Sequence, residues 1–286
     1  MKSLTKSITI SLLIGIALSS FIPAHNSISK SQTGADSSQL LKQKYKLGLS
    51  AHRGSSIVAP ENTLSTFNAV LAMGVDYIEI DVRTTKDGQL VILHDGTLNR
   101  TTNGQGPMKN FTLAELKQLS AGKGYNERFK EERIPTLQET TQLLANWNKT
   151  HKHKTNLYVD CKDVAPEPLV EQLKASKLLK DAVFYGSDDF LMALKKVYPK
   201  AKLMPSLNKA EEIADKVKRL NPYAFDVRWT ILNENLVAEI HTHKVKIFTD
   251  VLGLLDNPNN YKKATTMGID LIQTDYVRKV YQTLLD

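Results

Sequence analysis

The sequence predicts an α/β protein built on a closed barrel of eight parallel strands, each followed by a helix. Short apolar runs of three to six residues alternate with longer amphipathic segments from residue 47 to the C-terminus. This strict alternation is typical of a parallel sheet covered by helices. Eight strand–helix pairs in 286 residues fit a (β/α)8 barrel, the TIM-barrel fold. An open doubly wound sheet is the alternative, but it needs a glycine-rich turn after the first strand, which this sequence lacks.

The expected elements follow one another at regular intervals. The strands are residues 47–51, 77–81, 156–161, 182–185, 202–205, 224–227, 245–248 and 271–273. The helices are residues 63–73, 136–147, 166–176, 189–197, 209–220, 233–243, 260–267 and 276–285. Gly74 ends the first helix, and a capping box of Thr136 and Glu139 begins the second.

One segment after the second strand interrupts the alternation. A Lys-Asp-Gly turn at 86–88 leads into an extra strand-like run at 90–94, and residues from about 96 to 135 are rich in Gly, Asn, Thr and Lys. This segment contains one expected helix, 113–119, which opens with a capping box of Thr112 and Glu115. We interpret the segment as an insertion into an otherwise regular barrel.

The first residues are expected to lie outside the barrel domain. A basic start, an apolar run over 8–21 and the small residue Ala24 predict a secretory signal peptide over residues 1–24. An uncleaved anchor is the alternative, but the run is shorter than the roughly 20 residues that span a bilayer. Residues 25–44 are expected to be a flexible leader to the domain at 45–286. The protein is therefore expected to be exported, periplasmic or secreted, with no stable membrane span after cleavage.

Composition narrows the class of protein. A hydrophobic content of 41% and a charged content of 24% are ordinary for a globular enzyme. The net charge of +8 suits anionic substrates or surfaces, although a solvated basic surface explains it equally well. No Lys/Arg stripe with interleaved aromatic residues favours nucleic-acid binding. Cys161 is the only cysteine, so no internal disulfide forms, and nothing in the sequence sets the oligomeric state.

Carboxylates mark the second expected strand. Alternation with period two places Glu79 and Asp81 on one face of this strand. Two carboxylates this close repel each other, so a cation is expected between them, most simply a hard divalent metal ion. Asp81 lies at the carboxyl end of this strand. Three further polar residues lie at the ends of other strands: His52, Lys162 and Asp275. Active sites of this fold lie at the carboxyl ends of the strands, which makes this group the candidate site.

Four motifs in the first third of the chain, in this order and spacing, resemble the glycerophosphodiester phosphodiesterase family. They are His-Arg-Gly at 52–54, Pro-Glu-Asn-Thr at 60–63, Glu-x-Asp at 79–81 and His-Asp at 94–95. The resemblance continues through Asp-x-Lys at 160–162 to Gln-Thr-Asp-Tyr at 273–276, and the family carries a comparable insertion after its second strand. The resemblance points to bacterial, exported members.

The resemblance implies Asp160 as a third metal ligand beside Glu79 and Asp81. The family more often has Glu where this chain has Asp160, and the shorter side chain can change the ligand geometry. Three oxygen ligands, without a His-x-x-x-His or Cys-x-x-Cys pair, favour Mg²⁺ or Ca²⁺ over zinc.

The remaining expected roles follow the chemistry of a phosphodiester. His52 and His94 match the family's two catalytic histidines, and histidine titrates near neutral pH, as an acid–base catalyst must. Arg53 can grip the phosphate with its planar fork, and Lys162 adds a compact positive charge. Two neighbouring polar residues, Glu61 and Asn62, either orient these groups or cap the following helix. The attacking oxygen is either water or a hydroxyl of the substrate's own glycerol.

The seventh strand departs from the family pattern. Members often carry aromatic-Thr-x-Asn there, whereas this chain reads Ile-Phe-Thr-Asp at 247–250. Phe248 is expected to keep the aromatic role in substrate binding. Asp250 changes the polar group, which puts the specificity for the head group or glycerol in question.

The function expected from the resemblance is metal-dependent hydrolysis of glycerophosphodiesters to sn-glycerol 3-phosphate and an alcohol. One alternative keeps the site but changes the substrate, to an intact lipid in a phospholipase D-like reaction or to a glycerophosphate polymer. Another alternative is a catalytically inactive barrel that acts as a binding module. The presence of both histidines and all three acids disfavours that alternative.

Overall fold

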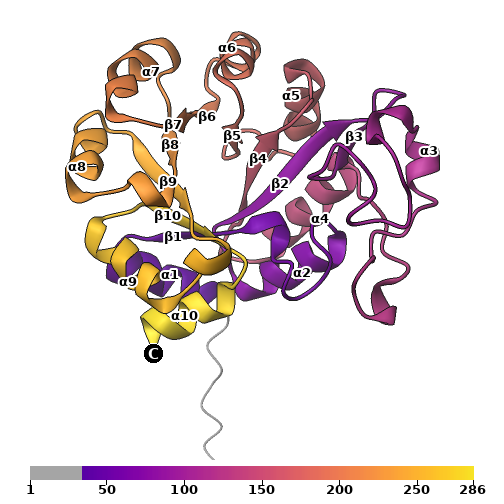
Figure 1. Cartoon of the computed structure of the whole chain (residues 1–286), viewed down its shortest axis with the longest axis horizontal. Coiled ribbons are helices and arrows are strands. Elements are labelled where there is room, and N and C mark those ends of the chain that lie inside the picture. Colours follow the sequence, from indigo (N-terminus) through magenta and orange to yellow (C-terminus); the bar gives the residue numbers. More distant parts are fainter. Residues whose placement is uncertain (1–33) are drawn as a thin grey trace, which may run out of the picture. The chain divides into compact units, whose positions relative to one another are not determined.

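The computed structural model describes residues 34–286 (Figure 1). The expected signal peptide and the first part of the expected leader lie outside the described residues. Within 34–286, no helix is both long enough and apolar enough to cross a membrane.

The described strands form one sheet that closes into a barrel. They are β1 (Gly48–Ala51), β2 (Tyr77–Thr84), β3 (Leu90–Ile92), β4 (Asn156–Cys161), β5 (Val183–Tyr185), β6 (Lys202–Met204), β7 (Ser206–Leu207), β8 (Ala224–Val227), β9 (Lys246–Asp250) and β10 (Leu271–Thr274). The order is β6-β5-β4-β2-β1-β10-β9-β8-β7, with parallel neighbours throughout. Because β6 and β7 are separated only by Pro205, they act as one kinked strand and close the ring. The predicted (β/α)8 barrel is confirmed.

Helices surround this ring on the outside (Figure 1). They are α1 (Gly34–Tyr45), α2 (Leu64–Met73), α3 (Leu113–Leu116), α4 (Leu137–Thr150), α5 (Pro166–Ala175), α6 (Asp188–Val197), α7 (Ile213–Leu220), α8 (Glu234–Thr242), α9 (Pro258–Met267) and α10 (Val277–Leu285). The bounds agree closely with the expected helices, except that α3 ends earlier and α1 was not expected.

Helix α1 corrects the prediction of a flexible leader up to residue 44. Leu41 is fully buried in the main core. Buried Asp76, just before β2, accepts hydrogen bonds from Ser38 Oγ at 2.7 Å and from the Leu49 amide at 2.9 Å, and pairs with Lys42 Nζ at 2.6 Å. The polar composition of this stretch masks its few buried positions, which is why the sequence reads as a leader.

The barrel interior is apolar toward the amino ends of the strands. Tyr77, Tyr158 and Phe248 pack there, with Tyr77 and Phe248 edge to face at 5.6 Å between ring centroids. Since side chains alternate along each strand, the next inward positions toward the carboxyl ends are Glu79, Asp160 and Asp250. The inward-facing residues therefore change from apolar to acidic in the next layer toward the carboxyl ends of the strands, and the site begins at that layer. This finding corrects the prediction for Phe248, which is buried below the site and does not line it.

The insertion has a small core of its own. Strand β3 pairs antiparallel with β2, and apolar residues of the following loops pack against it. Both predicted capping boxes are present, Thr112 with Glu115 at α3 and Thr136 with Glu139 at α4. The insertion is thus an ordered extension of one side of the barrel, beside β2 and α4 (Figure 1).

Candidate active site

A tight turn at the end of β1 presents the first two site residues. Arg53, Gly54 and Ser55 all have positive φ, at 48°, 82° and 85°. A Cβ atom on Gly54 would lie 2.4 Å from Thr66 Cγ2, so only glycine fits. The Thr66 hydroxyl donates to the carbonyl of Gly54 at 2.8 Å and fixes the turn against α2. His52 and Arg53 are therefore held at the barrel mouth by a conformation that the glycine makes possible.

Three carboxylates face one another beside this turn. Glu79, Asp81 and Asp160 each offer an oxygen within 4.8 Å of the others, and Asp81 is the register partner of Asp160 across β2 and β4. Burial and the nearby charges of Asp81 and Asp160 raise the pKa of Glu79 well above its ordinary value. Burial also raises the pKa of Asp160. Oxygen Oδ1 of Asp81 is buried, and Lys162 Nζ lies 3.2 Å from it. Crowded, desolvated carboxylates fit a hard divalent cation.

Two basic side chains border the carboxylates. Lys162 Nζ lies 2.5 Å from Asp160 Oδ2 and 3.2 Å from Asp81 Oδ1. Burial opposes its charge, but these two acids outweigh burial and the pKa of Lys162 is raised. Arg53 donates its main-chain N–H to Glu79 Oε2 at 2.8 Å, and its Nε lies 3.6 Å from Asp81 Oδ2. Both cations therefore lie where a phosphate beside the carboxylates would meet them.

Glu61 and Asn62 support the site and do not cap the helix. Thr63 is the N-cap of α2. Asn62 Nδ2 donates to Asp81 Oδ2 at 2.8 Å, and Glu61 Oε1 accepts from Arg53 Nη1 at 3.1 Å. Of the two roles that the sequence left open, the structure favours orientation of neighbouring site residues, Asp81 by Asn62 and Arg53 by Glu61.

Each predicted catalytic histidine has a carboxylate on Nδ1. His52 Nδ1 lies 3.1 Å from Asp275 Oδ1, and His94 Nδ1 lies 2.8 Å from Asp95 Oδ1. A carboxylate at Nδ1 fixes the ring and favours a proton on that nitrogen. Nε2 is then the nitrogen that can exchange a proton with a substrate.

The sequence did not reveal Arg100, which joins the insertion to the site. Its guanidinium binds Glu61 through two bonds of 2.7 and 2.8 Å and Asp95 through two bonds of 2.8 and 2.9 Å. These bonds from Arg100 hold the pKa of Asp95 well below its ordinary value. Arg100 lies in a polar stretch without periodicity, so no sequence signal distinguished it. Arg100 thereby connects Glu61, which bonds Arg53, with Asp95, which bonds His94.

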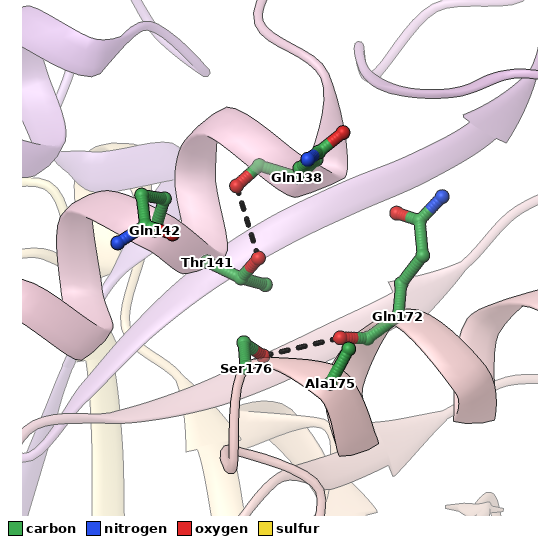
Figure 2. Close-up of a pocket in the computed structure, with 6 residues that line it drawn as sticks. All are labelled: Gln138, Thr141, Gln142, Gln172, Ala175 and Ser176. Carbon is green, nitrogen blue, oxygen red and sulfur yellow. Dashed lines mark hydrogen bonds between the residues drawn. The ribbon is translucent and has the colours of Figure 1, made fainter.

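Every predicted site residue except Phe248 lies at the carboxyl ends of the strands. His94 is joined to Asp81 through Asp95, Arg100, Glu61 and Arg53. His52 pairs with Asp275 and precedes Arg53, whose main-chain N–H bonds Glu79. A separate hollow between α4 and α5 on the outer helix layer offers no comparable chemistry (Figure 2). There the hydroxyls of Thr141 and Ser176 donate to carbonyls of their own helices, at 3.1 and 3.2 Å.

Comparison with known proteins gives the same assignment. A model of the glycerophosphoryl diester phosphodiesterase family matches residues 52–279. The chain belongs to this family. It is accordingly a phosphoric diester hydrolase, a glycerophosphodiester phosphodiesterase.

Relatives of this phosphodiesterase cover most of its length. The protein YhdW of Bacillus subtilis (strain 168) is 33% identical over 236 residues, which are 79% of this chain and 93% of that protein. A glycerophosphodiester phosphodiesterase of Bacillus altitudinis is 28% identical over the same coverage of 79% and 93%. A solved structure of an Oleispira antarctica phosphodiesterase in complex with the product sn-glycerol-3-phosphate is 26% identical, with a TM-score of 0.76 and coverage of 84% of this chain and 97% of that chain.

Proposed function

We propose that this phosphodiesterase hydrolyses glycerophosphodiesters to sn-glycerol 3-phosphate and an alcohol, using one divalent cation and two histidines. The observation that carries the proposal is that two Asp-paired histidines, His52 and His94, lie at the same end of the barrel as the three clustered carboxylates. The product bound to the Oleispira antarctica relative supports the same substrate class.

The phosphate would lie over the carboxylates, between the two basic side chains. A cation held by Glu79, Asp81 and Asp160 would polarise a phosphoryl oxygen and offset developing charge. Either Mg²⁺ or Ca²⁺ suits these oxygen ligands. Arg53 and Lys162 would bind the remaining phosphoryl oxygens and keep the diester in place.

The histidines would divide the two proton transfers. One Nε2 removes a proton from the attacking oxygen as the new P–O bond forms. The other Nε2 gives a proton to the alkoxide as its P–O bond breaks, so the alcohol leaves neutral. Asp275 and Asp95 would stabilise whichever ring is positively charged.

Hydrolysis of glycerophosphocholine by the purified protein tests the proposal. We expect turnover with Mg²⁺ or Ca²⁺, none with EDTA, and a loss of roughly 10²- to 10⁴-fold in His52→Ala. His241→Ala is the matched control, because His241 also pairs with an aspartate, Asp270 at 2.9 Å, but lies on α8. Metal-independent turnover, or equal losses in both variants, would refute the mechanism.

Export belongs to the proposal as well. The basic start and apolar run at 1–24 support a cleaved signal peptide. The mass of the protein recovered from outside the cytoplasm checks this. Recovery of the uncleaved chain in the cytoplasm would contradict it.

A further inference from the structure

Exposed apolar side chains gather at one edge of the barrel mouth. Among the described residues, five large hydrophobic side chains are exposed. Four of them follow strand ends or pack on such a loop: Ile57 after β1, Leu254 after β9, Tyr276 after β10, and Tyr125 of the insertion. Only Val197, on α6, lies elsewhere. A single exposed leucine is ordinary, but a grouping of this kind marks an interaction surface.

The segments that carry Ile57, Tyr125, Leu254 and Tyr276 are neighbours, and we call these four residues the arc. Strands β9, β10 and β1 are adjacent in the sheet, so the loops at their carboxyl ends are neighbours. The Tyr125 hydroxyl donates to the carbonyl of Ser56 at 2.8 Å, next to Ile57. The Ser55 hydroxyl donates to the carbonyl of Asp275 at 2.5 Å, which joins the loop after β1 to the loop after β10. The arc therefore borders the His52–Asp275 pair.

The most exposed member of the arc is held by a rigid base. Leu254 is 98% exposed, at the centre of the turn Gly253–Leu255. The following residue, Asp256, is buried and accepts hydrogen bonds from Tyr261 Oη at 2.5 Å and Thr274 Oγ1 at 2.6 Å. Because its turn is anchored, Leu254 can insert into an apolar layer with little further loss of conformational entropy.

Cationic side chains lie among the aromatic members. Lys279 Nζ is 5.1 Å from the ring centroid of Tyr276. The Arg128 guanidinium lies 4.6 Å from the ring of Phe129, which packs edge to face on Tyr125. Apolar tips, aromatic rings and Lys/Arg side chains together are the composition of segments that bind the interface of anionic membranes.

We propose that this arc docks on an anionic phospholipid surface, with Leu254 and Ile57 among the acyl chains. The inference deepens the proposed function, on which its chemistry rests. We assign as further substrates glycerophosphodiesters that carry one acyl chain and lie in a lipid surface. Water adds to phosphorus and the P–O bond to the head group breaks, so the products are the acylated glycerol phosphate and the alcohol. A water-soluble diester has no apolar part that would match the arc, whereas a lysophospholipid has one.

Site-specific fluorescence on the full chain tests the docking. Leu254→Cys and Val197→Cys are each labelled with an environment-sensitive dye and mixed with vesicles of phosphatidylcholine and phosphatidylglycerol. The native Cys161 is buried and its thiol pKa is raised, so the introduced cysteine takes the label. We expect a blue shift of emission at position 254 and none at 197. The absence of a shift at 254, or equal shifts at both positions, overturns the proposal.

Turnover of a vesicle-bound substrate and of a soluble substrate, measured side by side, separates this inference from the proposed function. Leu254→Ser should lower hydrolysis of lysophosphatidylcholine in phosphatidylglycerol vesicles by about tenfold, because it removes one leucine from the lipid. It should leave soluble glycerophosphocholine turnover unchanged, and Val197→Ser should change neither rate. Equal vesicle rates in wild type and Leu254→Ser overturn the docking. A dye shift at 254 without turnover of either substrate upholds docking and refutes the proposed function.

Discussion

An aspartate bonded at Nδ1 distinguishes the two catalytic candidates from His241. His52 and His94 offer Nδ1 to an aspartate, whereas His241 bonds Asp270 through Nε2. Within residues 34–286, the side chain of Asp275 bonds only His52, since its other hydrogen bonds use its main chain. The two catalytic candidates thus present the same nitrogen, Nε2, to a substrate.

Asp275→Asn should lower kcat by roughly 10²- to 10⁴-fold with little change in Tm, because the amide no longer stabilises the imidazolium. The pH–rate profile should change as well, because the imidazolium ring of His52 loses its negatively charged partner. Steady-state kinetics across pH check this, with Asp270→Asn as the control. A fall in kcat with an unchanged pH profile would contradict a positioning role for Asp275.

Glu79 links the site to stability. Its pKa lies well above the ordinary 4.5, because of burial and because of Asp81 and Asp160. The metal-free folded state therefore binds this proton more tightly than the unfolded chain does. The contribution of this proton to the free energy of unfolding is fully present below the pKa of Glu79 in the unfolded chain. It is lost as pH rises through the higher pKa of the folded state. A cation held by Glu79 would require its deprotonated form, so metal affinity should increase with pH.

Glu79→Gln should raise the Tm in EDTA at neutral pH, because it removes a buried charge. The expected gain is roughly 1 kcal/mol or more, about 2–4 °C for a domain of this size. The gain should shrink as pH falls toward 4.5, and the rise in Tm on adding Mg²⁺ or Ca²⁺ should disappear. Thermal melts with and without metal measure both effects. Exposed Glu171→Gln should do neither, and a lower Tm for Glu79→Gln in EDTA would argue against the charge explanation.

At the scale of elements, one arginine couples the insertion to the barrel. Arg100 holds Glu61, which holds Arg53, and also holds Asp95, which holds His94. Arg100→Ala should lower kcat/KM by roughly 10- to 100-fold, the range for groups that support site residues. Arg100→Lys should restore little, because lysine cannot form two bidentate pairs.

Kinetics and melts on the same preparations check the Arg100 prediction. Arg133→Ala is the matched control, because Arg133 also lies in the insertion and pairs with Glu131 at the surface. Full activity in Arg100→Lys would show that charge alone suffices.

The elements that sequence could predict are those with a period or a cap. The strands around Glu79 and Asp160 alternate, and Thr136 with Glu139 gave a sharp helix start; the structure has all three. Arg100 acts through contacts with residues distant in sequence, which no local pattern encodes. The predicted role of Phe248 was wrong for a different reason. Its strand was predicted correctly, but its depth in the barrel depends on the register with β8 and β10.

For the whole molecule, the two ends of the barrel have separate tasks. The carboxyl ends of the strands carry the buried charges of the site, which cost stability when no metal is bound. Near the opposite end, α1 adds buried apolar surface and is tied to the sheet through Asp76. We infer that α1 offsets part of the cost of the site and unfolds together with the barrel.

Leu41→Ala tests this inference on cooperative unfolding. Leu41 is fully buried in the main core, and truncating a buried leucine typically costs 2–5 kcal/mol. If α1 belongs to the cooperative unit, the whole melt should shift by several degrees as one transition, at about 2–4 °C per kcal/mol. Exposed Gln43→Ala on the same helix should leave Tm unchanged. If α1 were instead a separately melting leader, Leu41→Ala would leave the main transition in place, and stability would reside in the barrel alone.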